Sequence, residues 1–306
     1  MTLPGAALPR RMPQFTPVVC ALDLAPESTP ALVAAVALAE RAGGALHLVT
    51  VRPPPAADAY RAPSDPEAAV RAVVEVTVDK ALGAGACARI APEIVVARQD
   101  DPAESVLGYA RDVGAGVLVM GTSGRVGIQR FRLGSVAEDV MRQAPCPVLV
   151  VPNESASRAP GPERPVLVPV DFSQASARAL QLARAFADLY DAPIEVLNVE
   201  DGAGRAALAA SAMAVHKAGL PSQHLSLDAD LRAFVDDVGA GEVGIHVVDG
   251  APADQVVAQA RTMDAAVVVM GTRGRRGPTR ALFGSVAEAA LRRLRCPVLT
   301  VRPPDA

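Results

Sequence analysis

Two glycine-rich segments have the spacing of an anion-binding loop that leads into a helix. In each segment a Gly-x-x-Gly pair is followed, after nine intervening residues, by Gly-Ser. The positions are Gly121, Gly124, Gly134 and Ser135, and again Gly271, Gly274, Gly284 and Ser285. Glycines let the backbone approach a ligand closely, successive N–H groups form a nest for anions, and a helix N-terminus adds free N–H donors with partial positive charge. The pattern predicts a phosphate site in which the serine donates its hydroxyl.

The same residues also have a purely structural interpretation. Ser135-Val136-Ala137-Glu138 and Ser285-Val286-Ala287-Glu288 fit the capping box, in which a serine and a glutamate satisfy N–H groups at the start of a helix. The arginines of the two spacers, such as Arg125 and Arg275, either clamp phosphates or are simply solvated. The residues alone leave both interpretations open.

The elements that must position these glycines are repeated along the chain. The segment that starts at Val117 recurs without a gap from Val267, and the sequence around Asp23 resembles that around Asp171. A stretch rich in proline, serine and charge separates the copies. We therefore expect a first domain over residues 13–152, a linker over 153–164 and a second domain over 165–303.

Each copy alternates strand-like and helix-like runs. In the first copy, strands are predicted at 18–22, 45–51, 94–97, 117–120 and 148–151. Helices are predicted near 30–42, with Thr29 as N-cap and Gly43 just past the end, and near 67–82, 103–113 and 135–143. Continuous apolar strands that alternate with helices predict an α/β fold with a doubly wound parallel sheet. Ligands bind such sheets outside the carboxyl ends of the strands, where the strand order reverses.

Composition excludes several classes of protein. The 306 residues carry a net charge of −3, which is not the footprint of a nucleic-acid-binding protein. The only lysines, Lys80 and Lys217, do not follow a glycine, so a Walker A loop is absent. The longest apolar stretch, 31–39, is too short to cross a membrane, and no signal peptide is recognisable, so we expect a cytoplasmic protein without a membrane partner. The four cysteines form no C-x-x-C pair, and no histidine recurs between the copies, so neither a metal site nor a catalytic nucleophile with its base is predicted.

The pattern G-x-x-G-x9-G-[ST], after V-M-G-T and with an aspartate that ends the first strand, closely resembles the universal stress protein family in both halves. The resemblance implies two five-stranded parallel-sheet domains of strand order 3-2-1-4-5 in tandem, with helices on both faces. It also implies ATP binding, typical of members with the complete motif, and a role in stress adaptation, dormancy or signalling. No catalytic reaction beyond weak nucleotide hydrolysis is established for the family.

The resemblance assigns roles to matching positions in each half. Asp23 and Asp171 match the aspartate near adenine and ribose, and Val51 and Val199 match the valine whose backbone reads adenine. The remaining matches are Met120 and Met270 beside the nucleotide, the glycines and serines of the phosphate loop, and Val136 and Val286 after them. Gly250 belongs to the family's Gly-x-Pro, which only the second copy retains. Without the resemblance, a valine or methionine at a strand end reads as core, and the aspartate as a helix cap.

The copies differ around the expected site. The first has Asp100-Asp101-Pro102 where the second has Gly250-Ala251-Pro252, and carboxylates disfavour a nearby phosphate. The first also has Ala25 where the second has Ser173, and so lacks a hydroxyl. We expect both halves to bind ATP and the second to bind it more tightly.

The last strands, 148–151 and 298–301, are apolar and should lie at sheet edges, which need cover. In the family these strands pair across a dimer interface. We therefore expect the halves to pair as a pseudo-dimer within one chain, and two chains can associate further as a homodimer.

The sequence thus predicts an ATP-binding stress-response regulator that acts through nucleotide-dependent conformation or partner binding, with Mg²⁺ accompanying the triphosphate. The first alternative is a protein-interaction scaffold whose glycine loops are structural and empty. The second is a weak ATPase, for which no general base is evident. A literal G-x-G-x-x-G at 239–244 has the wrong context for a dinucleotide site, because it follows a predicted helix and precedes a predicted strand.

Overall fold

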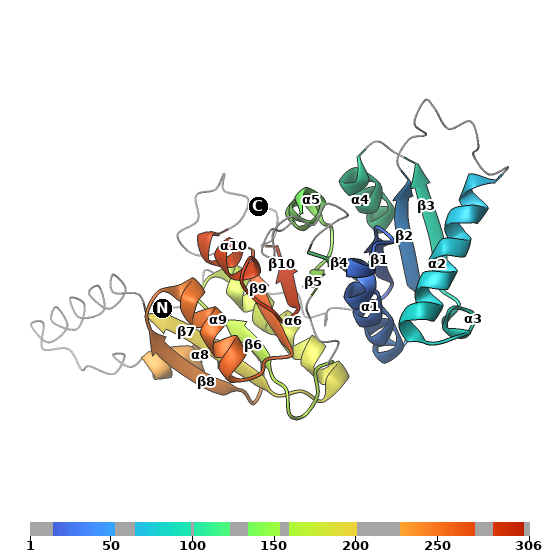
Figure 1. The fold of residues 1–306 in the computed structure, drawn as a ribbon. Helices are drawn as coiled ribbons and strands as arrows, with labels where there is room; N and C mark the ends of the chain where they lie inside the picture. Colours follow the sequence, from blue (N-terminus) through green and yellow to red (C-terminus); the bar gives the residue numbers. More distant parts are fainter. Residues whose placement is uncertain are drawn as a thin grey trace, which may run out of the picture.

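The computed structural model describes residues 15–52, 65–98, 101–122, 134–153, 159–200, 227–272 and 284–302. Its strands form one ten-stranded sheet of order β3-β2-β1-β4-β5-β10-β9-β6-β7-β8 (Figure 1). Each half, counted from its outer edge, has the order 3-2-1-4-5. Neighbouring strands are parallel within each half. The predicted doubly wound α/β fold is therefore confirmed.

The strands of the sheet are β1 (Val18–Leu22), β2 (Leu46–Arg52), β3 (Glu93–Arg98), β4 (Val117–Gly121), β5 (Val148–Val151), β6 (Val166–Pro169), β7 (Ile194–Glu200), β8 (Gly244–Asp249), β9 (Val267–Gly271) and β10 (Val298–Val301). The α-helices are α1 (Thr29–Ala42), α2 (Pro66–Leu82), α3 (Ala86–Ile90), α4 (Pro102–Asp112), α5 (Ser135–Gln143), α6 (Gln174–Tyr190), α8 (Leu227–Val238), α9 (Pro252–Thr262) and α10 (Ser285–Leu291). The short α3 is not expected from the sequence, and α1 has Ser28 rather than Thr29 as its N-cap.

The start and end of α1 illustrate how local sequence sets these elements. Pro30 lies in its first turn, where a missing N–H costs nothing. Gly43 ends the helix in the left-handed conformation, with φ of 65°, and its N–H bonds back to the carbonyls of Ala39 and Glu40. No helix in the described part of the chain is long and apolar enough to cross a membrane.

Each face of the sheet is covered by helices from both halves. One apolar cluster contains side chains of α1, α2, α6 and α8, and the other contains those of α4, α5, α9 and α10. Successive strand residues alternate between them, so Val18 and Cys20 belong to the first cluster and Val19 to the second. Each cluster continues from one half into the other, so the two halves share both cores.

The halves are joined by β5 and β10, the one antiparallel pair that the described strands form. Leu149 lies opposite Leu299 and Val150 opposite Val298, and the Thr300 hydroxyl donates to the Val148 carbonyl at 3.2 Å. Both leucines are buried, at 3% and 0% exposure. The strands expected at edges therefore pair with each other, as the pseudo-dimer interpretation predicts, and they lie at the centre of the sheet (Figure 1).

Replacing Leu299 with alanine should destabilise the protein by about 2–5 kcal/mol, because it leaves a cavity under the strand pair that joins the halves. Chemical unfolding followed by circular dichroism measures the loss. Val73→Ala is the matched control, because Val73 is 49% exposed on α2 and its truncation should change the free energy of unfolding by no more than about 0.5 kcal/mol. Equal losses of unfolding free energy in the two variants would contradict a shared core beneath the β5–β10 pair.

Candidate functional site

The carboxyl ends of β1, β2 and β4 bring the expected residues of the first half to one end of the sheet. Leu22 pairs with Thr50, and Ala21 pairs with Met120. Asp23, Val51 and Gly121 follow these residues directly, at the same end of three neighbouring strands. The helices that follow β1 and β4 cover opposite faces, because α1 and α5 belong to different apolar clusters. The strand order therefore reverses here, which is the place where doubly wound sheets bind their ligands.

The second half repeats this arrangement. Asp171 follows β6, Val199 lies in β7, and Gly271 ends β9. Gly250 follows β8, and its N–H donates to the carbonyl of Glu200 at 3.0 Å. The structure therefore gathers these residues of both halves at strand ends, whereas Gly124, Gly274 and the spacer arginines lie outside the described residues.

A threonine holds the start of each glycine-led helix against the end of its strand. The N–H of Gly134 donates to the carbonyl of Thr122, and the N–H of Gly284 donates to that of Thr272, both at 2.7 Å. The threonine N–H groups donate in turn to Val151 and to Val301, at 3.2 and 3.0 Å. The sequence analysis does not single out these threonines. Both threonines end a V-M-G-T segment that occurs once in each half, and this repetition could have identified them from the sequence.

The capping-box interpretation is wrong in both halves. Gly134 and Gly284 are the N-caps, with φ near −69° and −68°, and no side chain caps either helix. Ser135 and Ser285 are already the first helical residues, one position too late to cap. Glu138 does not reach back to the start of α5, since its carboxylate accepts a hydrogen bond from Arg292 at 3.1 Å. Within the described segments, the first-turn N–H groups of α5 therefore have no side-chain acceptor, so they can bind an anion.

The carboxylate of Asp23 is only half satisfied. Its Oδ1 accepts the N–H of Ala25 at 3.1 Å, whereas its Oδ2 is buried and has no hydrogen-bond partner among the described residues. Buried carboxylate oxygens normally have a donor, so a lone one calls for an explanation. A hydroxyl or amine of a ligand would supply that donor.

The residue that follows each aspartate has a strained backbone. Leu24 and Phe172 both have φ of 61°, in the left-handed region that residues other than glycine rarely adopt. Asp171 shares the turn geometry of Asp23, because its Oδ1 accepts the N–H of Ser173 at 3.1 Å. Strain of this kind often marks functional sites, and here it recurs at the same position of both halves.

The methionines and valines at the strand ends lie against the core. Met120 and Met270 are 5% and 3% exposed, within the cluster beneath α5 and α10. Val51 and Val199 are partly buried against the same cluster. Val136 is also partly buried there, whereas Ser135 and Ser285 are exposed. The serine hydroxyls are therefore accessible, and the apolar side chains form the floor at this end of the sheet.

The halves differ in how the neighbouring helices begin. Asp101 is the N-cap of α4, and its carboxylate accepts the N–H groups of Ala103 and Glu104 at 2.8 and 3.2 Å. The corresponding helix α9 has Ala251 as its N-cap and no side-chain cap. Asp100 lies outside the described residues. The carboxylate of Asp101 is thus committed to a helix, and it still brings negative charge to this end of the first half.

The hydroxyl of Ser173, which the first half lacks, caps a helix. Ser173 caps α6, and its Oγ accepts the N–H of Ser176 at 3.1 Å. In the first half a 3₁₀ turn, Pro26–Ser28, precedes α1 and replaces this cap. The difference at Ala25 and Ser173 therefore follows from two ways of starting a helix.

Nothing in the described part of the chain forms a metal cluster of three or more His, Cys, Asp or Glu side chains. The cysteines are poor nucleophiles, because burial raises the pKa of Cys20 and of Cys146 to about 12 and that of Cys296 to about 11. Burial, followed by the nearby carboxylates of Glu75 and Asp79, raises the pKa of Cys87. The G-x-G-x-x-G at 239–244 joins α8 to β8, which confirms the predicted context of a helix before it and a strand after it, the reverse of the context of a dinucleotide loop.

Comparison with known proteins gives a consistent result. The model of the universal stress protein family matches residues 14–152 and 163–302. A universal stress protein of Mycobacterium tuberculosis is 32% identical over 194 residues, which cover 61% of this chain and 62% of the relative. The match thus spans less than two thirds of that relative's length. A universal stress protein of Methanocaldococcus jannaschii is 29% identical over 140 residues, 45% of this chain and 82% of the relative.

Solved structures agree on the fold. A functionally unknown protein from Pseudomonas aeruginosa covers 94% of this chain, and 92% of its own chain is covered, at 20% identity and a TM-score of 0.65. A universal stress protein from Archaeoglobus fulgidus aligns with 94% of this chain and 97% of its own chain, at 20% identity and a TM-score of 0.58. A universal stress protein in complex with cAMP covers 47% of this chain and is covered over 99%, at 24% identity and a TM-score of 0.33, a likeness too weak to carry an argument.

The two strand-end glycines should respond differently to alanine. A Cβ at Gly271 would lie 2.7 Å from the Cβ of Ala175 and 2.9 Å from its backbone carbon, whereas at Gly121 the nearest atom is 3.8 Å away. Gly271→Ala should therefore lower the free energy of unfolding by about 1–3 kcal/mol, and Gly121→Ala by no more than about 0.5 kcal/mol. Urea unfolding of both variants measures this, and equal losses would contradict the close packing of α6 on β9.

The thiols with raised pKa values should resist modification. A pKa near 12 leaves Cys20 and Cys146 protonated at pH 8, with a thiolate fraction about a thousandfold below that of a free cysteine. Ellman's reagent should therefore label these two slowly in the native protein and rapidly in urea. Fast native labelling of Cys146, identified by mass spectrometry, would show that this thiol is not desolvated.

Proposed function

Because the chain belongs to the universal stress protein family, we propose that it is an ATP-binding regulatory protein with one nucleotide site in each half. The proposed sites are those at the carboxyl ends of β1, β2 and β4 and of β6, β7 and β9. The proposed domains are residues 13–152 and 165–303, joined by a linker. Regulation would follow from a change in conformation or partner choice when ATP binds. The cytoplasmic location stays a prediction of the sequence.

The observation that carries the proposal is the buried Oδ2 of Asp23. It has no donor among the described residues, and it lies at the strand ends where a doubly wound sheet binds ligands. A ribose hydroxyl or the adenine amine would donate to it. Asp171, in the same turn of the second half, would take the same role.

The phosphates would bind where α5 and α10 begin. The glycine N-caps add no side chain that would compete for the helix N–H groups. Ser135 and Ser285 would each donate a hydroxyl, and Val136 and Val286 would add backbone N–H donors. Gly124 and Gly274 would complete the loops. The helix dipole favours the negative charge of a triphosphate at this position.

The adenine would lie across the other strand ends. The backbone of Val51 and of Val199 would read its edge, next to Met120 and Met270. In the second half Gly250, with φ of 139°, would let the chain pass close to the ligand. Mg²⁺ would enter with the nucleotide, since it is commonly held by phosphates and water rather than by a protein cage.

The second site should be the tighter one. Negative charge near a phosphate weakens its binding, and the first half places Asp101 at the end of the sheet where the second half has Ala251. The N-terminus of α9 also keeps its N–H groups free of a side-chain cap. Both differences favour an anion in the second half.

Calorimetric titration of nucleotide-free protein with Mg-ATP tests the proposal. We expect two sites per chain, with the tighter one lost in Gly284→Leu and the weaker one in Gly134→Leu, because each leucine covers the N–H groups that would hold phosphate. Gly108→Leu is the matched control, since a Cβ at this position of α4 would meet no atom within 4 Å outside the helix's own backbone. It should leave both sites intact.

Three outcomes would count against parts of the proposal. Equal affinities, or a tighter first site, would contradict the assigned order of the halves. Absence of binding, confirmed by equilibrium dialysis, would favour the interaction scaffold with empty loops. Turnover of ATP well above background, lost when Asp171 is changed, would favour the ATPase.

A further inference from the structure

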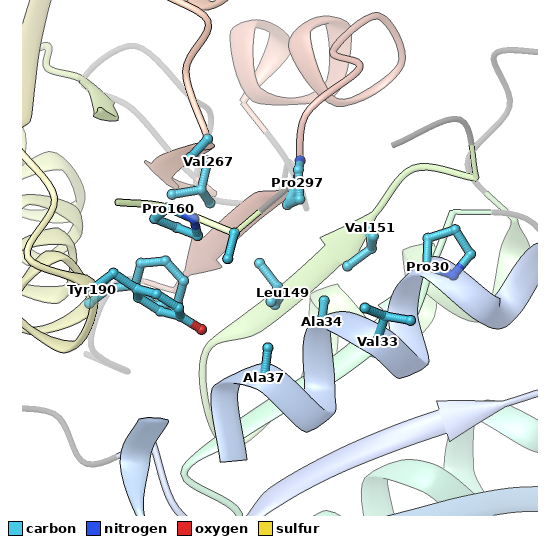
Figure 2. A pocket seen from close by; sticks show the side chains of 13 residues that line it. Pro30, Val33, Ala34, Ala37, Leu149, Val151, Pro160, Tyr190, Val267 and Pro297 are labelled. Atoms are coloured by element: carbon cyan, nitrogen blue, oxygen red, sulfur yellow. The ribbon is translucent and has the colours of Figure 1, made fainter. Parts of the chain in front are cut away.

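An apolar cavity lies beside the β5–β10 pair that joins the halves, away from the strand ends described above. It is bounded by α1, β5, the end of α6, Pro160, the start of β9 and Pro297 before β10, and its volume is about 60 Å³. Pro30, Val33, Ala34 and Ala37 line it from α1, and Leu149 and Val151 form its floor from β5 (Figure 2). Both halves contribute to it, because α1 and β5 belong to the first and α6 to the second.

One polar group of the second half reaches this cavity. Tyr190 ends α6 and is 5% exposed, and its hydroxyl points toward the space between α1 and β5 (Figure 2). No hydrogen bond joins this hydroxyl to another group in the part of the chain that the structure describes. The side chain is largely buried, but its hydroxyl oxygen is not fully enclosed, so a ligand atom that accepts or donates a hydrogen bond can reach it.

A cation stands at the same end of the cavity. Residues 30, 33, 34 and 37 follow one face of α1, and helical periodicity places Arg41 next on that face. The Arg41 guanidinium carbon lies 5.6 Å from the centre of the Tyr190 ring. Arg41 is exposed, and among the described residues no carboxylate pairs with it, neither that of its neighbour Glu40 nor that of Asp191 beside Tyr190.

We propose that this cavity binds a short aliphatic carboxylate, with its carbon chain between α1 and β5 and its carboxylate between Arg41 and Tyr190. The lining excludes a charged or strongly polar tail, since such a group would lose its hydration there. The volume sets the length, because an apolar cavity of about 150 Å³ holds benzene and one less than half as large holds a chain of about three carbons. The site is independent of the proposed nucleotide sites.

Titration of the full chain with butanoate, followed by ¹H–¹³C spectra of its methyl groups, tests the proposal. We expect saturable shifts at Val33, Ala34 and Leu149 at millimolar concentrations. Arg41→Gln should weaken butanoate binding about tenfold, because it removes a charge-assisted hydrogen bond, and should leave butan-1-ol binding unchanged. Tyr190→Phe should weaken both ligands about threefold, and Ala34→Leu should abolish both by filling the cavity.

Arg232→Gln, which removes an exposed arginine on α8, is the matched control and should bind butanoate like the unchanged protein. The proposal is overturned if butanoate causes no saturable shift at tens of millimolar. It is also overturned if Arg41→Gln binds butanoate unchanged, or if the shifts appear only with rising protein concentration, since a second copy of the chain would then occupy the cavity. Mg-ATP titration of the same variants separates this result from the proposed nucleotide sites, which should be unaffected.

Discussion

The antiparallel pairing of β5 with β10 is the constraint on which the rest of the molecule depends. Both strands are short and apolar, and either one alone would leave an edge open to other chains. Their pairing buries these edges and joins two parallel sheets into one. Because this pair is antiparallel, the strands of the two halves run in opposite directions. The two sets of strand ends that carry the candidate sites therefore lie at opposite ends of the ten-stranded sheet.

The same pairing brings helices of the two halves together differently on each face. On one face Arg292, the C-cap of α10, donates to both Glu138 and Glu288, at 3.1 and 2.9 Å, and thus links the two glycine-led helices. On the other face α1 and α6 flank the central strands and leave the apolar cavity between them. The β5–β10 pairing thus has a polar link between the proposed phosphate-binding helices on one face of the sheet and the apolar cavity on the other face.

The two halves share the backbone geometry of the site, but they differ in the packing around it. Both halves have the strained residue after the aspartate, the threonine that holds the glycine N-cap, and the uncapped helix. Gly271 is packed tightly against Ala175, whereas Gly121 has room for a methyl group. The two halves therefore need the same loop geometry, and the reason for glycine at the strand end differs between them.

The sequence by itself determined most of the elements, their order and the family, because helix caps, apolar runs and the repeated glycine spacing are local patterns. Gly43 ends α1 where its type predicts, and several strands, such as β1 and β5, have the expected bounds. Only the tertiary structure decided that Ser135 is one residue too late to cap its helix, that Asp101 is committed to α4, and that a Cβ cannot fit at Gly271. It alone also placed Tyr190 and Arg41 beside one cavity. These facts depend on strand register and on distances between segments far apart in the chain, which local spacing does not encode.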